Sequence, residues 1–175
     1  HISQKMDIYL PKNNKEKHPA VIVIYGSGWS SNNKKLSNYQ KKVFVKPLSE
    51  KGFATISINH RSSNLDSVYP AQIHDVKAVI RFLRAKHEDY NLDISFIGVA
   101  GYSSGGHLAA LAGTSSNNPL VEGNVGSYLE YDSHVNAVVD FYGITDLSVY
   151  YECPTTEDKN LTSEQKIRVF GDIDN

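Results

Sequence analysis

The chain has 175 residues, of which 40% are hydrophobic and 21% are charged, and these proportions are ordinary for a globular protein. This length is enough for one domain with a hydrophobic core and short for two. The formal net charge of -1 gives the whole molecule no attraction to nucleic acid or to an acidic membrane surface. No run of about 18 apolar residues predicts a membrane span. Cys153 is the only cysteine, which excludes an intrachain disulfide, and its neighbours offer no base, which favours a structural role.

Short apolar runs alternate with helical stretches along the chain. Strands are predicted at residues 6–10, 21–25, 53–59, 95–100 and 137–142. The continuous β-branched character of the second run is typical of a strand that is buried on both faces of a sheet. Helices are predicted at residues 37–51, 70–90 and 104–112. Pro47 predicts a kink or break in the first helix, whereas Pro70 suits the first turn of the second.

This alternation predicts a single α/β domain over residues 1–175, with a mostly parallel sheet and helices on both of its faces. In such sheets the catalytic and ligand-binding groups gather at the carboxyl ends of the strands. The functional residues are therefore expected at that edge.

The sequence GYSSG at residues 101–105 has the pattern G-x-S-x-G and lies between a predicted strand and a predicted helix. A strand that turns at once into a helix strains the backbone of the corner residue and exposes its side chain. The residues two before and two after the corner are pressed together, and Gly101 and Gly105 supply the small side chains that this crowding demands. The pattern predicts that Ser103 is a nucleophile beside the positive end of a helix; a plain Gly-rich turn is the alternative.

Ser104 is the rival serine. As a nucleophile it would need Tyr102 and Gly106 as its flanking pair, and Tyr102 is too bulky for that crowding. Its expected role is instead to donate a backbone N–H to the oxyanion of the reaction.

A second motif, Gly26-Ser27-Gly28, follows the strand at residues 21–25. An oxyanion hole needs backbone N–H groups that point inward, and small residues let such a loop approach the substrate closely. The position at a strand end favours an oxyanion loop over a neutral turn.

Together these motifs resemble those of α/β-hydrolase-fold carboxylesterases of the hormone-sensitive-lipase-like and bacterial feruloyl and acetyl-xylan esterase groups. A His-Gly-Gly-Gly-Trp-type loop and a Gly-x-Ser-Ala-Gly-Gly-His elbow of those groups correspond to YGSGW at residues 25–29 and GYSSGGH at residues 101–107. The match continues through residues 69–72, 75–78, 122–126 and 140–146. The resemblance implies Ser103 as nucleophile, with the N–H groups of Ser27 or Gly28 and of Ser104 as oxyanion donors. It slightly favours a secreted or periplasmic location.

The chain departs from these groups in two ways. Tyr25 replaces their usual His and Ser27 a usual Gly, so the loop is expected to be less pliable or tuned to another acyl group. In this fold the triad runs Ser, then Asp or Glu, then His, but the last histidine, His134, precedes the final predicted strand. The sequence therefore predicts an α/β-hydrolase fold that is truncated before its last two strands and is nearly inactive by itself.

Other histidines and acids are weaker candidates for catalysis. His107 is expected to be structural, His134 to lie on the surface, and His60 to be loop-borne, whereas His74 and His87 look solvated. Asp140 and Asp146 are expected to make structural bonds or to cap a helix, and Asp75 is a candidate ion-pair partner of Arg61. No pair of histidines has metal-ligand spacing, so neither a metal nor a cofactor is expected.

The favoured hypothesis is a serine ester hydrolase that acts on short-acyl or polysaccharide-linked esters through an acyl-enzyme. An amidase or peptidase on the same scaffold and a non-catalytic hydrolase-like binding module are the alternatives. The expected partners are the ester substrate and a C-terminal segment or second fragment, and no nucleic acid.

Overall fold

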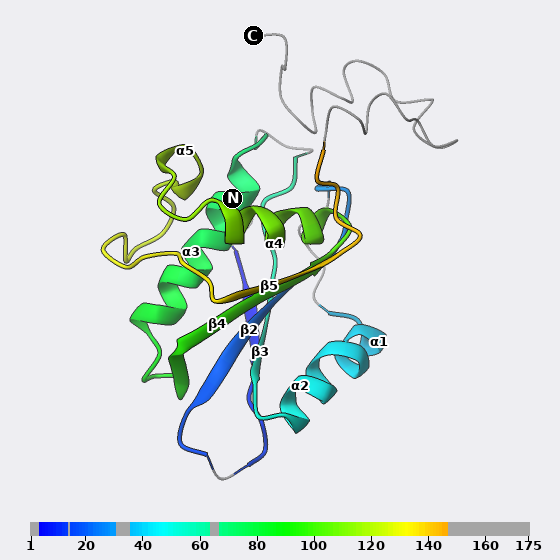
Figure 1. Cartoon of the computed structure of the whole chain (residues 1–175), viewed down its shortest axis with the longest axis vertical. Coiled ribbons are helices and arrows are strands. Elements are labelled where there is room, and N and C mark those ends of the chain that lie inside the picture. Colours follow the sequence, from blue (N-terminus) through cyan, green and yellow to red (C-terminus); the bar gives the residue numbers. More distant parts are fainter. Residues whose placement is uncertain (1–3, 14, 31–35, 64–66, 147–175) are drawn as a thin grey trace, which may run out of the picture.

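A computed structural model describes residues 4–13, 15–30, 36–63 and 67–146 of the chain, and Cys153 lies outside them. The centre of the described part is a five-stranded mixed sheet in the order β1-β3-β2-β4-β5 (Figure 1). β1 runs antiparallel to β3, and the other neighbouring pairs are parallel. The strands are Met6–Tyr9 (β1), His18–Ile24 (β2), Ala54–Ile58 (β3), Leu92–Tyr102 (β4) and Ala137–Phe141 (β5).

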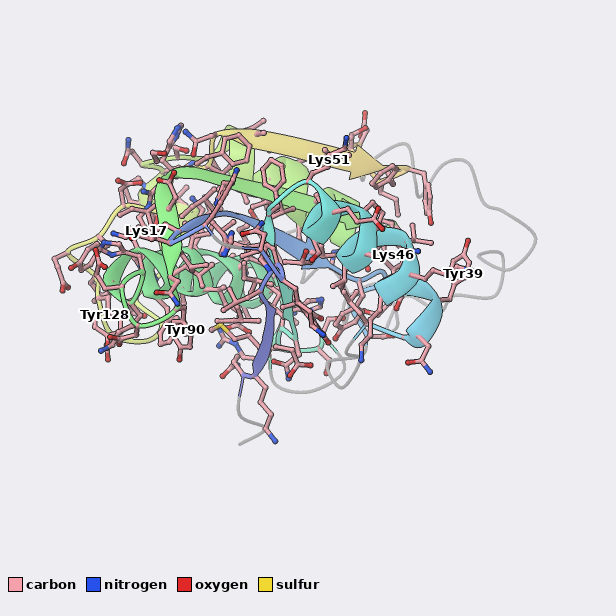
Figure 2. The ribbon with its side chains drawn as sticks, turned by 90° about the horizontal axis from the view of Figure 1, so that it is seen from below. Lys17, Tyr39, Lys46, Lys51, Tyr90 and Tyr128 are labelled. Atoms are coloured by element: carbon pink, nitrogen blue, oxygen red, sulfur yellow. The ribbon has the colours of Figure 1, made fainter. Side chains whose placement is uncertain are left out.

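Helices cover both faces of the sheet, which confirms the predicted fold class. One face carries α3 (Ala71–Ala85), α4 (Ser104–Thr114) and the short α5 (Pro119–Glu122), and the other carries α1 (Asn38–Gln40) and α2 (Lys46–Glu50) (Figure 1). Seen from below, β1 and β5 lie at opposite edges of the sheet, and Tyr39 on α1 points away from the ribbon (Figure 2). No described helix is long and apolar enough to cross a bilayer.

The core lies between the sheet and α3 and α4. All five residues of β3, which lies between β1 and β2, are buried. The helical stripe of α3 faces them through its apolar residues at helical spacing: Ile73, Val76, Val79, Ile80 and Leu83. At about 25 cal/mol per Å² of apolar surface, this burial is the main force that holds the strand ends in place.

Two predicted helices differ from the observed ones. The helix predicted at residues 70–90 ends at Ala85, because the chain turns over residues 86–91 and reaches a left-handed conformation at Asn91, with φ of 53°, before β4 begins. The helix predicted at residues 37–51 is continuous but changes to π-helical geometry over Lys41–Val45. Pro47 has no N–H to donate, and the π segment immediately before it accommodates that loss.

A network of buried charges fastens the segment after α4 to α3. Glu122 accepts from Lys77 Nζ at 2.7 Å and from Arg81 Nη1 at 3.2 Å, and Ser133 donates to it at 2.6 Å. Burial raises the pKa of the Glu122 carboxyl, but the hydrogen bonds from Lys77 and Ser133 and the two cations outweigh it and lower the pKa. Glu122 therefore stays ionised and pairs with both buried cations.

β5 is an exposed edge of the sheet. All five of its residues are exposed, and among the described residues it pairs only with β4. The strand predicted at residues 137–142 is therefore an edge of the described part of the sheet. Exposed apolar edges of this kind readily pair with further strands.

Candidate active site

Ser103 stands at the corner between β4 and α4. It adopts a φ of 55° and a ψ of -128°, a backbone conformation that costs a non-glycine residue about 1–3 kcal/mol. A Cβ on Gly101 would lie 2.1 Å from the carbonyl oxygen of Gly105, and a Cβ on Gly105 would lie 2.3 Å from the carbonyl oxygen of Ile24. The crowding that the G-x-S-x-G pattern predicts at this corner is therefore present, and larger side chains are excluded at both glycines.

Backbone hydrogen bonds hold the corner from both sides. The N–H of Ser103 donates to the carbonyl oxygen of Phe141 on β5 at 3.0 Å, and the carbonyl oxygen of Ser103 accepts from the N–H of His107 at 3.1 Å. The Ser103 side chain is half-buried, and within the described part of the chain its hydroxyl has no hydrogen-bond partner. Neighbouring strands and the helix thus fix the backbone while the hydroxyl stays available.

The Gly26-Ser27-Gly28 loop lies against this corner. A Cβ on Gly26 would lie 2.6 Å from the carbonyl oxygen of Tyr102 and 2.8 Å from Ser103 Cβ, so only glycine allows the loop to come this close. Gly28 is exposed and has a φ of 57°. The loop after β2 and the turn after β4 therefore meet at the carboxyl edge of the sheet, as expected.

Ser104 connects the two motifs. Its side chain is fully buried, and its Oγ accepts a hydrogen bond from the Ser27 N–H at 2.8 Å. Its own N–H belongs to the first turn of α4, where helical N–H groups have no intrahelical acceptor. The sequence offered no signal for this side-chain contact, because the two residues are separated by 77 positions.

None of the described histidines donates to or accepts from the Ser103 hydroxyl. His107 Nδ1 contacts the carbonyl oxygen of Ile144 at 2.7 Å, and its ring packs edge-on against Trp29 at 5.4 Å, consistent with the structural role expected for it. His134 is exposed, as expected. His74 and His87 are half-buried rather than solvated, because each packs against a backbone segment.

His60 lies beside Tyr25, the residue that precedes the Gly26-Ser27-Gly28 loop. Its ring is 1% exposed and stacks on Tyr25, the residue before Gly26, with 5.4 Å between ring centroids. Nδ1 contacts the carbonyl oxygen of Arg61 at 2.8 Å, and Nε2 has no partner among the described residues. Burial lowers the pKa of His60, against smaller opposite effects of the Arg61 carbonyl and the Asp75 charge. Its neutral form is therefore the favoured one.

The acidic candidates make structural contacts. Asp140 Oδ1 accepts from the N–H of Gly143 at 2.7 Å, which shapes the turn after β5. Asp75 pairs with Arg61 at 2.9 Å. The segment that Asp146 was expected to cap lies outside the described residues. Within the described part, no group of three or more His, Cys, Asp or Glu side chains has the arrangement of a metal site.

Comparison with known proteins agrees with this geometry. The sequence pattern of the family described as BD-FAE matches residues 6–172. The chain belongs to the BD-FAE family. Esterase LipQ of Mycobacterium tuberculosis is 35% identical to this BD-FAE chain over 130 residues, and an acetylxylan esterase of Xylanibacter ruminicola is 28% identical over 112 residues. These matches cover 74% and 64% of the chain but only 29% and 22% of the two relatives.

Solved structures also match most of this chain while extending beyond it. A bifunctional GH43-CE protein of Bacteroides eggerthii is 45% identical with a TM-score of 0.83, and the match covers 95% of the chain and 22% of that protein. A truncated carbohydrate esterase from gut microbiota is 44% identical with a TM-score of 0.82, over 95% of the chain and 59% of that structure. The α/β-hydrolase fold and the resemblance to carboxylesterases are thus confirmed, and the chain spans less than a third of LipQ.

Proposed function

We propose that the protein is a serine ester hydrolase that forms an acyl-enzyme on Ser103. The observation that carries this proposal is the strained corner at Ser103, enclosed by glycines, with an oxyanion-type loop packed against it. Known relatives that are named as esterases support the same reaction class. A binding module would have no need to maintain a backbone conformation that costs stability.

In the proposed reaction, Ser103 Oγ forms a bond to the ester carbonyl carbon and gives its proton to a general base. The carbonyl oxygen becomes an oxyanion, which accepts from the N–H groups of Gly28 and Ser104. Collapse of this intermediate breaks the carbon–oxygen bond to the alcohol, which leaves with the proton. Water then repeats the sequence on the acyl-enzyme, releases the acid and restores the Ser103 hydroxyl.

Between the two loop candidates, the hydrogen-bonding pattern favours Gly28 as the oxyanion donor. The Ser27 N–H already donates to Ser104 Oγ, whereas Gly28 is exposed at the edge of the loop. The general base is proposed to be a histidine outside these 175 residues, because no described histidine meets the Ser103 hydroxyl and none follows His134.

Short acyl groups on carbohydrates are the proposed substrates. An acetylxylan esterase and carbohydrate esterases among the relatives and solved structures support this class. Acetylated xylan, a feruloylated oligosaccharide and a simple aryl acetate, compared by kcat/KM in the full-length polypeptide, would rank the acyl and alcohol preferences.

A fluorophosphonate probe tests the nucleophile directly. In the full-length polypeptide we expect Ser103→Ala to abolish both labelling and hydrolysis, and Ser104→Ala to remain labelled to completion, though more slowly. Intact-mass spectrometry locates the adduct. Labelling that survives in Ser103→Ala, or that disappears in Ser104→Ala, would contradict the assignment.

An ester-hydrolysis assay of the isolated chain tests the source of the general base. We expect the isolated 175-residue chain to hydrolyse esters at most weakly, because a serine without a base is a poor nucleophile at neutral pH. Ordinary enzymatic turnover by a single 19.5 kDa species would overturn this expectation and direct attention to His60 and His107.

A further inference from the structure

The Ser104 side chain is placed differently from an ordinary first-turn helix residue. It is fully buried, and its hydroxyl oxygen faces the oxyanion loop, not solvent, where it accepts from the Ser27 N–H at 2.8 Å. One residue therefore offers two groups to the same region: a backbone N–H at the helix start and a side-chain acceptor for the loop.

The Ser27 peptide groups are engaged in holding the loop. While its N–H donates to Ser104, its carbonyl oxygen accepts from the N–H of Ser30 at 3.1 Å and from the Ser30 hydroxyl at 2.8 Å. An N–H that donates at 2.8 Å to a buried hydroxyl is directed toward that hydroxyl. The groups of Ser27 thus fix the loop conformation, and Gly28, the next residue, is left to meet the substrate.

Little packs against Gly28 itself. A Cβ on Gly28 would meet no atom within 4 Å, and Gly28 is exposed. Glycine at a φ of 57° is also free to change conformation. A Cβ on Gly26, by contrast, would lie less than 3 Å from the Tyr102 carbonyl oxygen and from Ser103 Cβ, so the backbone at Gly26 is closely packed. Between Gly26 and Gly28, the hydrogen bond of Ser27 to Ser104 links the loop to the start of α4. Beyond Gly28, the buried Trp29 anchors the loop in the core.

We propose that Ser104 is a positioning residue for the oxyanion hole. Its hydroxyl accepts a hydrogen bond from the Ser27 N–H and thereby aligns the Gly28 N–H with the N–H of Ser104. This inference rests on the proposed ester hydrolysis. A hydroxyl acceptor is required, so Ser104→Ala misplaces a donor without removing one. The effect falls on transition-state stabilisation, where donor geometry matters most.

A double-mutant cycle in the full-length enzyme tests the proposal. One change is Ser104→Ala, and the other replaces the Ser27 amide by an ester, through incorporation of glyceric acid, which deletes the N–H and keeps the side chain. Each change alone is expected to lower kcat about tenfold, less than the roughly 100-fold that a misplacement of 1 Å can cost, with KM within about twofold of wild type. Together they are expected to cost no more than either alone, because both remove one hydrogen bond.

Controls separate this role from general damage. Ser115→Ala removes a buried serine hydroxyl at the opposite end of α4, where it donates to the carbonyl oxygen of Leu111, and is expected to leave kcat unchanged. Ser104→Cys keeps a weak acceptor and is expected to recover part of the loss.

Three results would overturn the proposal. The first is a kcat of Ser104→Ala equal to or above that of wild type, and the second is no recovery of kcat in Ser104→Cys. The third is a further loss in kcat of about 100-fold when the Ser27 ester is added to Ser104→Ala, because that loss would make the Ser27 N–H a direct oxyanion donor. Fluorophosphonate labelling of Ser103 is measured on the same samples. Failure of the wild-type enzyme to label would count against the proposed function itself and is thereby distinguished from failure of this inference.

Discussion

The buried carboxylate of Asp75 on α3 accepts from the backbone N–H of Arg61 at 2.7 Å and from its guanidinium Nε at 3.0 Å. The Asp75 side chain is completely buried, whereas that of Arg61 is 31% exposed. Arg61 also donates to the carbonyl oxygen of Ala71 at 3.0 Å. The pair therefore fastens the loop after β3 to the first turn of α3, which confirms the ion pair considered from the sequence.

Replacement of Asp75 by Ala is expected to lower the free energy of unfolding by about 3 kcal/mol. It removes the acceptor of the Arg61 N–H and leaves the guanidinium with the Ala71 carbonyl oxygen as its remaining acceptor. Urea denaturation followed by circular dichroism measures the change. The matched control is Glu50→Ala, which removes the exposed pair with Lys46 at 3.9 Å and should change stability by less than about 1 kcal/mol. A loss at Asp75 no larger than that of the control would contradict the structural role.

Stability is expected to fall as the pH is lowered below about 6.5, because burial depresses the pKa of His60 in the folded state. The unfolded chain then binds the His60 proton more readily than the folded chain does, so that the contribution of His60 is present above the unfolded pKa and is lost as the pH falls toward the folded one. His60→Phe keeps a ring that can stack on Tyr25 and cannot be protonated.

Chemical denaturation of wild type and His60→Phe between pH 5 and 8, the range in which histidine titrates, measures this difference. We expect the free energy of unfolding of wild type, relative to that of His60→Phe, to fall from neutral pH toward the acid end. Parallel curves would show that His60 does not carry the pH dependence.

Gly101→Ala is expected to disrupt the nucleophile corner, because the new Cβ would lie 2.1 Å from the carbonyl oxygen of Gly105. Overpacking of this kind costs about 1–3 kcal/mol or more, and the backbone displacement that relieves it would move Ser103. Fluorophosphonate labelling rates and urea denaturation measure both effects. Gly98→Ala on the same strand is the control, since its Cβ would lie 3.3 Å from the Phe96 ring and 3.7 Å from the Ala137 carbonyl oxygen. Equal losses in the two variants would argue against a special role of the corner.

Local patterns predicted most of this fold correctly. β2, β3 and β5 are short runs rich in β-branched and apolar residues with Gly or Pro nearby, a composition that favours strands. The end of α3 was wrong by five residues: the prediction extended to residue 90, but the helix stops at Ala85. The chain must turn there to bring β4 alongside β2, and helical periodicity in the sequence does not indicate where such a turn begins.

The site was predictable where it depends on neighbours in the sequence, and not where it depends on tertiary contacts. Steric crowding at Gly101 and Gly105 follows from a spacing of four residues. Ser27 and Ser104 meet only because β2 and β4 are adjacent in the sheet. The burial of His60 was missed for the same reason: the chemistry of an imidazole suggests a surface loop, and only the position of Tyr25 beside it shows otherwise.

The hydrogen bond from the Ser103 N–H to the Phe141 carbonyl oxygen has a consequence for the dynamics of the enzyme. Strands at the edge of a sheet open earlier than central ones in native-state fluctuations, because fewer buried contacts must be given up. Within the described residues Phe141 belongs to such a strand, and its opening releases the backbone of Ser103 at the same moment. In the 175-residue chain, fraying of this edge and loss of the Ser103 backbone alignment are therefore one event, and hydrogen exchange of the Ser103 amide would report its frequency.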